Sequence, residues 1–329
     1  MILRFFKGTV PIVILMIAII FIAVWTPIFF SGTTISHNNP MPLYGFLEHL
    51  LGSKIWVSNI VAAAICATLA FLITKLNSTH FFIDERTFVP ALIFILFTAL
   101  LPQYQALNPA LPAALFMVFA IKRMLESYRK KGVAYNFFDA GILIGTGSLF
   151  YANLIWFGML IFIGIVIIRN INIEEITVSI FGLITPYLIM FGVYYLLDYN
   201  LNELFLLISG NLFSEAAGFS FSKLTIVALV FISIILVFCF VQMLMFQSAK
   251  KIRSRKALLL ISWMFFITIG VYFFVPSASC EIIWILGIPL SYFVANYLIF
   301  SKRKRFSEVL FSLFFMIVLA IQALYIWGR

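Results

Sequence analysis

Four short apolar runs surround one basic loop: FVPALIFILFTALLP (88–102), PALPAALFMVFAI (109–121), FFDAGILIGTGSLFYAN (137–153) and LIWFGMLIFIGIVII (154–168), with KRMLESYRKK (122–131) between the second and the third. An α-helix rises about 1.5 Å per residue, so about 20 apolar residues are needed to cross a bilayer core of roughly 30 Å. Runs of about 13 to 17 residues are too short to cross the core alone. We therefore expect neighbouring helices to shelter them, whether they span or turn back inside the membrane as re-entrant hairpins.

The second pair of runs carries small residues at helical spacing: Gly141, Gly145, Gly147 and Ser148. Small residues at one-turn intervals let two helix backbones approach closely inside a membrane. A helix that faces lipid has no need of this pattern, so we expect residues 88–168 to form the packed centre of the fold.

The composition indicates an integral membrane protein. Of its 329 residues, 64% are hydrophobic and only 10% are charged, and no segment has the composition of a water-soluble domain. The net charge of +10 would suggest nucleic acid as a partner of a soluble protein, but here the cations lie in loops between apolar runs. We therefore expect these loops to contact anionic lipid head groups or acidic partner proteins, and no nucleic acid.

The order of the runs predicts an all-α polytopic bundle that forms one domain over residues 1–329. Longer apolar runs occupy residues 9–30, 55–74, 177–197, 224–247, 257–275, 282–300 and 308–327. Together with the four short runs they make about eleven crossings, at about 20 residues for a full span. With the amino terminus inside, every one of the 22 Lys and Arg except Lys54, Lys223 and Arg329 lies on the cytoplasmic side. Because cationic loops stay inside, we expect a bacterial cytoplasmic (inner) membrane protein with its amino terminus inside and its carboxy terminus outside.

Each of the two long outward loops contains an amphipathic segment. The first places Leu43, Phe46, Leu47, Leu50 and Leu51 on one helical face, and the second does the same with Leu201, Leu204, Phe205, Ile208 and Leu212. Glu48 and His49 lie on the polar side of the first segment, and Glu203 lies on that of the second. We expect both helices to lie in the plane of the membrane interface.

No motif identifies a cofactor or a metal site: the sequence has no P-loop, no Rossmann glycine pattern, no His-Glu-x-x-His and no Cys-x-x-Cys. Glu48 and His49 form an adjacent acid–imidazole pair, suited to a general base or a metal ligand at the outer surface. The alternative is a solvated polar face, because adjacent helical residues point about 100° apart.

Asp139 is a second candidate for chemistry, as an intramembrane carboxylate. The alternatives for Asp139 are a cap in the first helical turn and an ion pair with the basic loop.

Three stretches resemble an uncharacterised family of bacterial inner-membrane proteins: MILRFFK (1–7), IIRNINIEE (167–175) and FGLITPY (181–187). This resemblance covers most of the chain and implies no activity.

The arrangement of residues 1–197 also resembles the membrane module of GT-C glycosyltransferases, with residues 198–329 as additional spans. The shared features are a first span, an outward loop with an interfacial helix, and short paired spans. Enzymes of that family use polyprenyl-phosphate sugars at the outer face and carry an acidic residue in the first outward loop. The resemblance implies a lipid-linked substrate, Glu48 as the base that activates the acceptor, His49 as its assistant, and Lys54, Lys223 and Glu203 as substrate contacts.

Two other classes of function stay open. The protein would otherwise be a non-catalytic membrane component that assembles with or stabilises envelope proteins. A transporter is less favoured, because ionisable residues within the apolar runs are nearly absent. A groove that leads from Glu48 into the bilayer would favour lipid-linked chemistry, whereas a filled interior would favour the scaffold.

The topology predicts that Cys280 reacts with a membrane-impermeant thiol reagent added from outside, because it lies in a short outward loop whereas Cys66 and Cys239 lie within apolar runs. Labelling of intact cells, followed by mass spectrometry of the protein, measures this. Labelling of Cys280 from the cytoplasmic side alone would overturn the topology.

Overall fold

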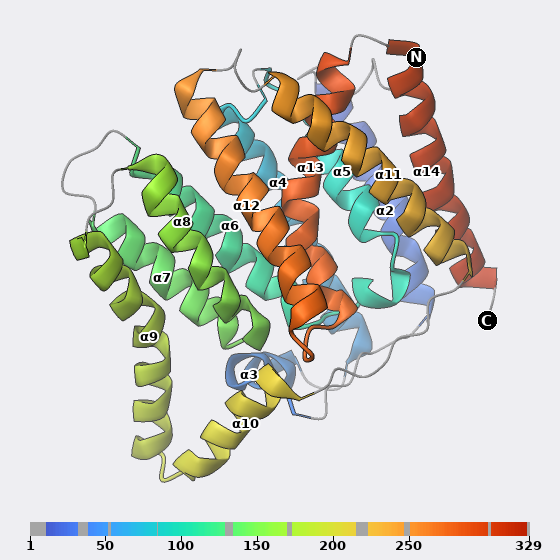
Figure 1. Ribbon diagram of the computed structural model, residues 1–329. Coiled ribbons are helices and arrows are strands. Elements are labelled where there is room, and N and C mark those ends of the chain that lie inside the picture. Colours follow the sequence, from blue (N-terminus) through green and yellow to red (C-terminus); the bar gives the residue numbers. More distant parts are fainter. Residues whose placement is uncertain are drawn as a thin grey trace.

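The computed structural model describes residues 11–31, 39–51, 54–83, 85–128, 134–169, 173–214, 223–246, 251–301 and 304–327, with side chains for all of them except 31, 223, 224 and 243–246. All regular secondary structure in this part of the chain is helical, which confirms the all-α prediction (Figure 1). The α-helices are α2 (Pro11–Ser31), α3 (Pro42–Leu51), α4 (Ile55–His80), α5 (Val89–Thr98), α6 (Ala110–Glu126), α7 (Ala134–Ser148), α8 (Gly158–Ile168), α9 (Ile173–Leu196), α10 (Leu201–Phe213), α11 (Lys223–Phe246), α12 (Ile252–Phe274), α13 (Ile283–Phe300) and α14 (Lys304–Trp327). Three short 3₁₀ helices are η1 (Pro102–Gln105), η2 (Ala152–Phe157) and η4 (Cys280–Ile282).

The helices fall into a long and a short class. In the described part of the chain, 7 segments are long and apolar enough to cross a bilayer: α2, α4, α9, most of α11, α12, η4 with α13, and α14. The short class comprises α5 with 10 residues, α6 with 17, α7 with 15 and α8 with 11. The sequence predicts this same division, and the result is a helical membrane bundle.

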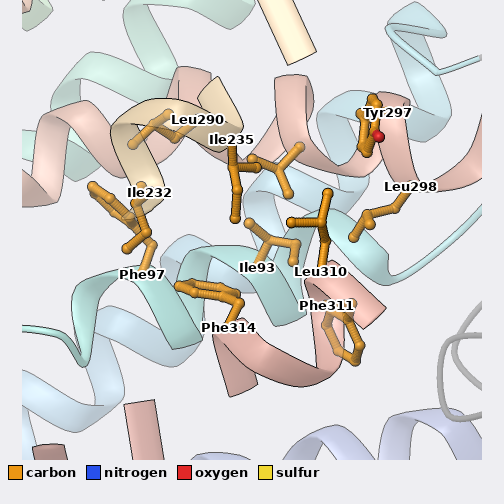
Figure 2. A pocket seen from close by; sticks show the side chains of 11 residues that line it. Ile93, Phe97, Ile232, Ile235, Leu290, Tyr297, Leu298, Leu310, Phe311 and Phe314 are labelled. Atoms are coloured by element: carbon orange, nitrogen blue, oxygen red, sulfur yellow. The ribbon is translucent and has the colours of Figure 1, made fainter. Parts of the chain in front are cut away.

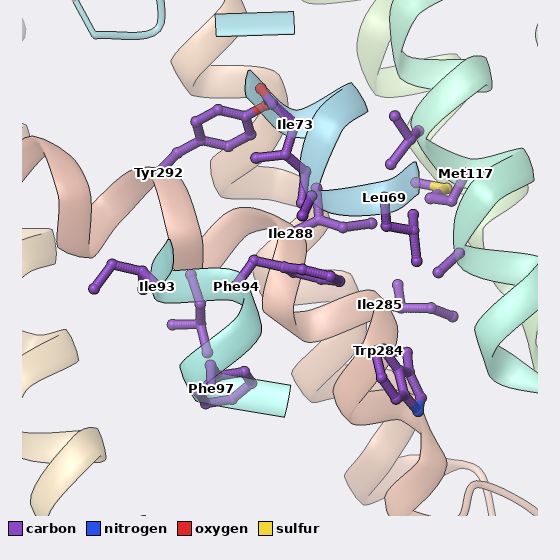
Figure 3. Packing of buried hydrophobic residues seen from close by; sticks show 14 of the residues in the cluster. Leu69, Ile73, Ile93, Phe94, Phe97, Met117, Trp284, Ile285, Ile288 and Tyr292 are labelled. Carbon is purple, nitrogen blue, oxygen red and sulfur yellow. The ribbon is translucent and has the colours of Figure 1, made fainter. Parts of the chain in front are cut away.

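The shortest of these helices, α5, lies within the bundle beside α13 (Figure 1), and all 10 of its residues are buried. Phe94 and Phe97 of α5 point toward α13 in Figure 3. A Cβ placed on Gly287 of α13 would lie 3.0 Å from Cε2 of Phe94, so the two helices are in direct contact. The expectation that neighbours shelter the short runs is confirmed for α5.

Two glutamines hold the turn that follows α5. Nε2 of Gln322, on α14, donates to the carbonyl of Ala99 at 2.7 Å and to Oε1 of Gln105 at 3.1 Å. Nε2 of Gln105 in turn donates to the carbonyl of Val24 on α2 at 3.4 Å. A helix that ends inside hydrocarbon leaves carbonyls without partners, and each costs several kcal/mol. The glutamines satisfy part of this demand and tie the turn to the first and last long helices.

A close helix contact joins α7 to α9, as the small residues predict. A Cβ on Gly141 would lie 2.7 Å from the Ser179 carbonyl oxygen, and one on Gly145 would lie 2.6 Å from that of Leu183. The hydroxyl groups of Ser148 and Tyr187 are 2.7 Å apart and share a hydrogen bond. The predicted contact is confirmed, and its partner is the long helix α9.

The helix α3 lies across the turns of both hairpins of short helices. The Tyr44 hydroxyl donates to the carbonyl of Leu107, in the turn between α5 and α6, at 3.1 Å. The backbone N–H of Leu43 donates to the carbonyl of Leu149, directly after α7, at 3.2 Å. The second amphipathic segment forms α10, and Asn211 on it donates to the carbonyl of Asn39 at 3.0 Å. Both predicted interfacial helices are therefore present, at the same end of the bundle.

The opposite end of the bundle is held by ion pairs. Arg169 lies 2.7 Å from the carboxylate of Glu175, and Arg123 lies 3.4 Å from that of Asp139. The expected first-turn position of Asp139 is wrong, because α7 begins earlier, at Ala134, and no acidic residue lies in its first turn. The ion-pair alternative for Asp139 is the one that the structure shows.

The replacement Gly145→Leu should lower the free energy of unfolding by about 1–3 kcal/mol or more, because the new side chain must push α9 away from α7. The matched control is Gly192→Leu on α9, since nothing lies within 4 Å of a Cβ at that position. Thermal unfolding and the monodisperse fraction in detergent measure both variants. Equal stability of the two would contradict the close contact.

Candidate functional site

A cavity of about 650 Å³ lies between α11, α12, α13 and the end of α5. In Figure 1 α11 and α12 diverge toward the end of the bundle that carries α3 and α10. Phe240 of α11 contacts Phe266 of α12, with ring centroids 5.4 Å apart, and beside this contact the space between the two helices stays open above α13. Its lining is Phe97, Leu101, Leu229, Ser233, Leu236, Val237, Phe240, Val241, Phe265, Phe266, Thr268, Ile269, Tyr272, Phe273, Cys280, Ile282, Ile283, Leu286 and Phe293.

The walls of this cavity offer a ligand mostly apolar groups, although some polar side chains line it. The hydroxyl of Ser233 donates to the carbonyl of Leu229 at 2.8 Å, and that of Thr268 donates to the carbonyl of Met264 at 2.7 Å. Each hydroxyl is thus satisfied within its own helix and offers little to a ligand. The remaining polar groups of the lining are Tyr272 and Cys280, whose Oη and Sγ atoms lie 3.8 Å apart. The cavity therefore has an apolar body and one polar end.

A buried carboxylate lies directly behind this polar end. Glu281, in η4, is only 4% exposed. Burial, together with smaller contributions that include the Glu281 charge, raises the pKa of the hydroxyls of Tyr44, Tyr104 and Tyr151. These tyrosines come from α3, from η1 and from the turn after α7, and hydrogen bonds at this end of the bundle join the three segments to one another and to α13. We name Glu281 and these three residues the tyrosine cluster.

The tyrosine cluster is joined to the rest of the bundle by hydrogen bonds at the same end. The indole N–H of Trp284 donates to the carbonyl of Tyr104 at 3.1 Å. The Ser277 hydroxyl lies 2.9 Å from both Oδ1 of Asn153 and the carbonyl of Leu212 on α10. These contacts hold the loop that carries Cys280 and Glu281 against the hairpin turns, which fixes the polar end of the cavity in place.

The predicted base lies near this cluster but outside the cavity. Glu48 and His49 are exposed on α3 and do not line the cavity. Burial and, after it, the charges of Glu48 and Glu281 raise the pKa of the Tyr44 hydroxyl. Tyr44 lies one helical turn before Glu48 on α3 and donates to the carbonyl of Leu107, so it connects the helix of the predicted base with the turn between α5 and α6.

The predicted substrate contacts, Lys54, Lys223 and Glu203, do not form one site in the described part of the structure. Lys54 is exposed just before α4, and Glu203 is exposed on α10. Glu203 accepts a hydrogen bond from Nδ2 of Asn200 at 3.3 Å, while Oδ1 of Asn200 caps α10 by accepting from the N–H of Asn202. This arrangement gives Glu203 a structural role at a helix start. Lys223 begins α11, and its side chain lies outside the described part of the structure.

Glu281 is not among the candidate residues that the sequence predicts, and its burial is a finding of the structure. The available signal was its position immediately before the run 282–300, which contains no charged residue. No group of three or more His, Cys, Asp or Glu side chains suited to a metal ion occurs among the residues that the structure describes.

A second space lies between α5, α11, α13 and α14 and is shown in Figure 2. Its volume is about 20 Å³ and its lining is apolar apart from Tyr297. A space of this size holds about one water molecule, and an apolar lining keeps such a space dry. It is a packing gap, and the larger cavity is the better candidate for a ligand.

The comparisons with known proteins identify a family without adding an activity. The model of a family of unknown function, DUF6427, matches residues 1–326. Neither a curated protein nor a solved structure matches the chain. Because the match extends over nearly the whole sequence, the chain belongs to the DUF6427 family of membrane-compatible helical proteins of unknown function.

Proposed function

We propose that the protein binds the hydrocarbon chain of a lipid-linked substrate in the cavity between α11, α12 and α13, and presents the polar end of that substrate at the outer face of the membrane. The observation that carries the proposal is the cavity itself. Its volume of about 650 Å³ falls in the range of ligand pockets, which is about 300–1,000 Å³. An apolar body with one polar end matches the two ends of an amphiphile.

The position of the polar end supports handling at the membrane surface. Tyr272 and Cys280 line it, and the tyrosine cluster lies directly behind it. The same end carries α3 and α10, whose exposed apolar residues, such as Phe46 on α3 and Phe205 on α10, suit the headgroup boundary of a bilayer. The distribution of Lys and Arg supports the assignment of this end to the outer face.

The chemistry proposed for this site is glycosyl transfer of the GT-C kind. In it, Glu48 takes the proton of the acceptor hydroxyl, His49 assists, and Lys54 and Lys223 lie near the phosphate of the lipid-linked sugar. Tyr44 supports this assignment, because it lies one helical turn before Glu48 and ties α3 to the turn between α5 and α6. Glu203, although proposed as a substrate contact from the sequence, is accounted for by its hydrogen bond to Asn200, the residue that caps α10.

One observation favours the alternative, a non-catalytic membrane component that binds a lipid or an envelope partner. Glu48, His49 and Lys54 do not line the cavity, so a bound lipid need not meet a reacting group. In that case the cavity holds a structural lipid and the polar residues of α3 only face solvent.

Filling the cavity should remove its lipid. The variant Ser233→Trp places an indole in the lining, whereas Ile234→Trp puts the same side chain on the exposed face of α11. Quantitative mass spectrometry of lipids that co-purify with the full chain should show loss of one long-chain lipid from Ser233→Trp only. Identical lipid content in wild type and both variants would argue against lipid binding in this cavity.

Removing the charge of Glu48 tests the catalytic assignment separately. Glu48→Gln keeps the size of the side chain but abolishes a base, so complementation of a deletion strain should fail at matched protein level. Glu203→Gln, on the other interfacial helix, should complement fully, and His49→Ala should have a milder effect. Full complementation by Glu48→Gln would leave the lipid-binding scaffold as the better account.

A further inference from the structure

Besides the apolar cavity and the packing gap, another large cavity lies at the opposite end of the bundle, where α4 and α6 end and α12 begins. Its volume is about 660 Å³, and Thr79, His80, Leu125, Glu126, Tyr128, Lys251, Ile252 and Arg253 line it. In contrast with the apolar cavity, its lining carries two cations and one imidazole. We refer to it as the basic cavity.

The imidazole of His80 is a buried donor without a partner. His80 is 1% exposed, and its Nδ1 lies 3.3 Å from a guanidinium nitrogen of Arg253. Because a guanidinium only donates, Nδ1 must be the acceptor, and Nε2 of the neutral ring therefore carries the proton. Nε2 is buried and has no hydrogen-bond partner. The hydrogen bond from Arg253 to Nδ1 holds the guanidinium, which belongs to the lining, in one orientation.

The charges of the lining also favour an anion. Lys251 and Arg253 are exposed at the start of α12, where the first backbone N–H groups of a helix attract negative charge. Glu126 is the acidic residue of the lining, but it lies 3.8 Å from Lys122 and 3.4 Å from Arg123, so cations of its own helix balance its charge. Lys256 adds another cation, with Nζ 5.6 Å from the centroid of the Tyr128 ring.

Free carbonyl groups at the carboxy-terminal end of a helix repel an anion. Near the ends of α4, α6 and α8, carbonyl groups already accept hydrogen bonds. The carbonyl of Asn77 near the end of α4 accepts from the N–H of Phe81 at 2.8 Å, and that of Met124 near the end of α6 accepts from the N–H of Ser127 at 3.2 Å. Nζ of Lys256 donates to the carbonyl of Ile168, at the end of α8, at 3.1 Å. These bonds satisfy one carbonyl near the end of each of the three helices.

We propose that the basic cavity binds a phosphate group, with Arg253 and Lys251 as its cationic contacts and His80 as the buried acceptor that orients the guanidinium of Arg253. The phosphate comes either from the headgroup of an anionic phospholipid or from a soluble phosphorylated compound. Both sources offer the same acceptor oxygens, and the guanidinium of Arg253 suits them because it donates two parallel hydrogen bonds. This site is independent of the proposed lipid-linked substrate, which occupies the other end of the bundle.

Native mass spectrometry of the full-length protein in detergent tests the proposal with two probes. One arm adds phosphatidylglycerol, with phosphatidylcholine as the neutral control, and the other adds inorganic pyrophosphate. Arg253→Gln should weaken binding of the effective probe about tenfold, the scale of one lost charge-assisted contact. The matched control is Arg255→Gln, since Arg255 is exposed on the same helix but does not line the cavity. It should bind like wild type.

The outcomes separate the sources and can overturn the site. Binding of phosphatidylglycerol that is lost in Arg253→Gln alone supports a lipid headgroup, and the same pattern with pyrophosphate alone supports a soluble ligand. Equal weakening by both variants indicates diffuse surface charge and overturns the proposal, as does the absence of binding by either probe. If Arg253→Gln fails to fold, Lys251→Gln, at an exposed position of the lining, carries the same comparison.

Discussion

Hydrocarbon offers no hydrogen bonds, so a helix that stops inside a membrane needs partners from the protein itself. The rest of this fold depends on how that demand is met. The turn after α5 receives donors from Gln322 and Gln105, and the end of α7 receives the N–H of Leu43. Through Tyr44 and Leu43, α3 connects both hairpin turns. The interfacial helix is therefore part of what holds the short helices in place.

Packing divides the bundle into a closed and an open part. In the closed part, glycines bring α7 against the backbone of α9, and Gly287 of α13 lies against the ring of Phe94 on α5. In the open part, α11 and α12 diverge above α13 and leave the apolar cavity (Figure 1). Close packing excludes ligands because protein interiors have few voids larger than a water molecule. The site of lipid binding is thus expected in the open part, beside a rigid wall formed by α13.

The sequence was sufficient for properties set by local pattern. Run length separates the spanning helices from the short ones, and one-turn spacing predicts the contact at Gly141, Gly145 and Ser148. Properties that arise only when distant segments meet could not be predicted from the sequence. Nothing in α11 or α12 alone predicts that they diverge, and Glu281 becomes buried because η4 is covered by segments that precede it by more than a hundred positions. The helix start of α7 also escaped prediction, since propensity sets helix ends poorly.

The two ends of the bundle differ in chemistry: an apolar cavity with a tyrosine cluster at one end, and a cavity lined by cations at the other. The central claim is that the apolar cavity holds a lipid chain. A cryo-electron microscopy map of the protein in nanodiscs tests it most directly. We predict an elongated density between α11 and α12 that ends beside Cys280. A map in which α11 packs directly on α12, with side chains filling the space, would contradict the account.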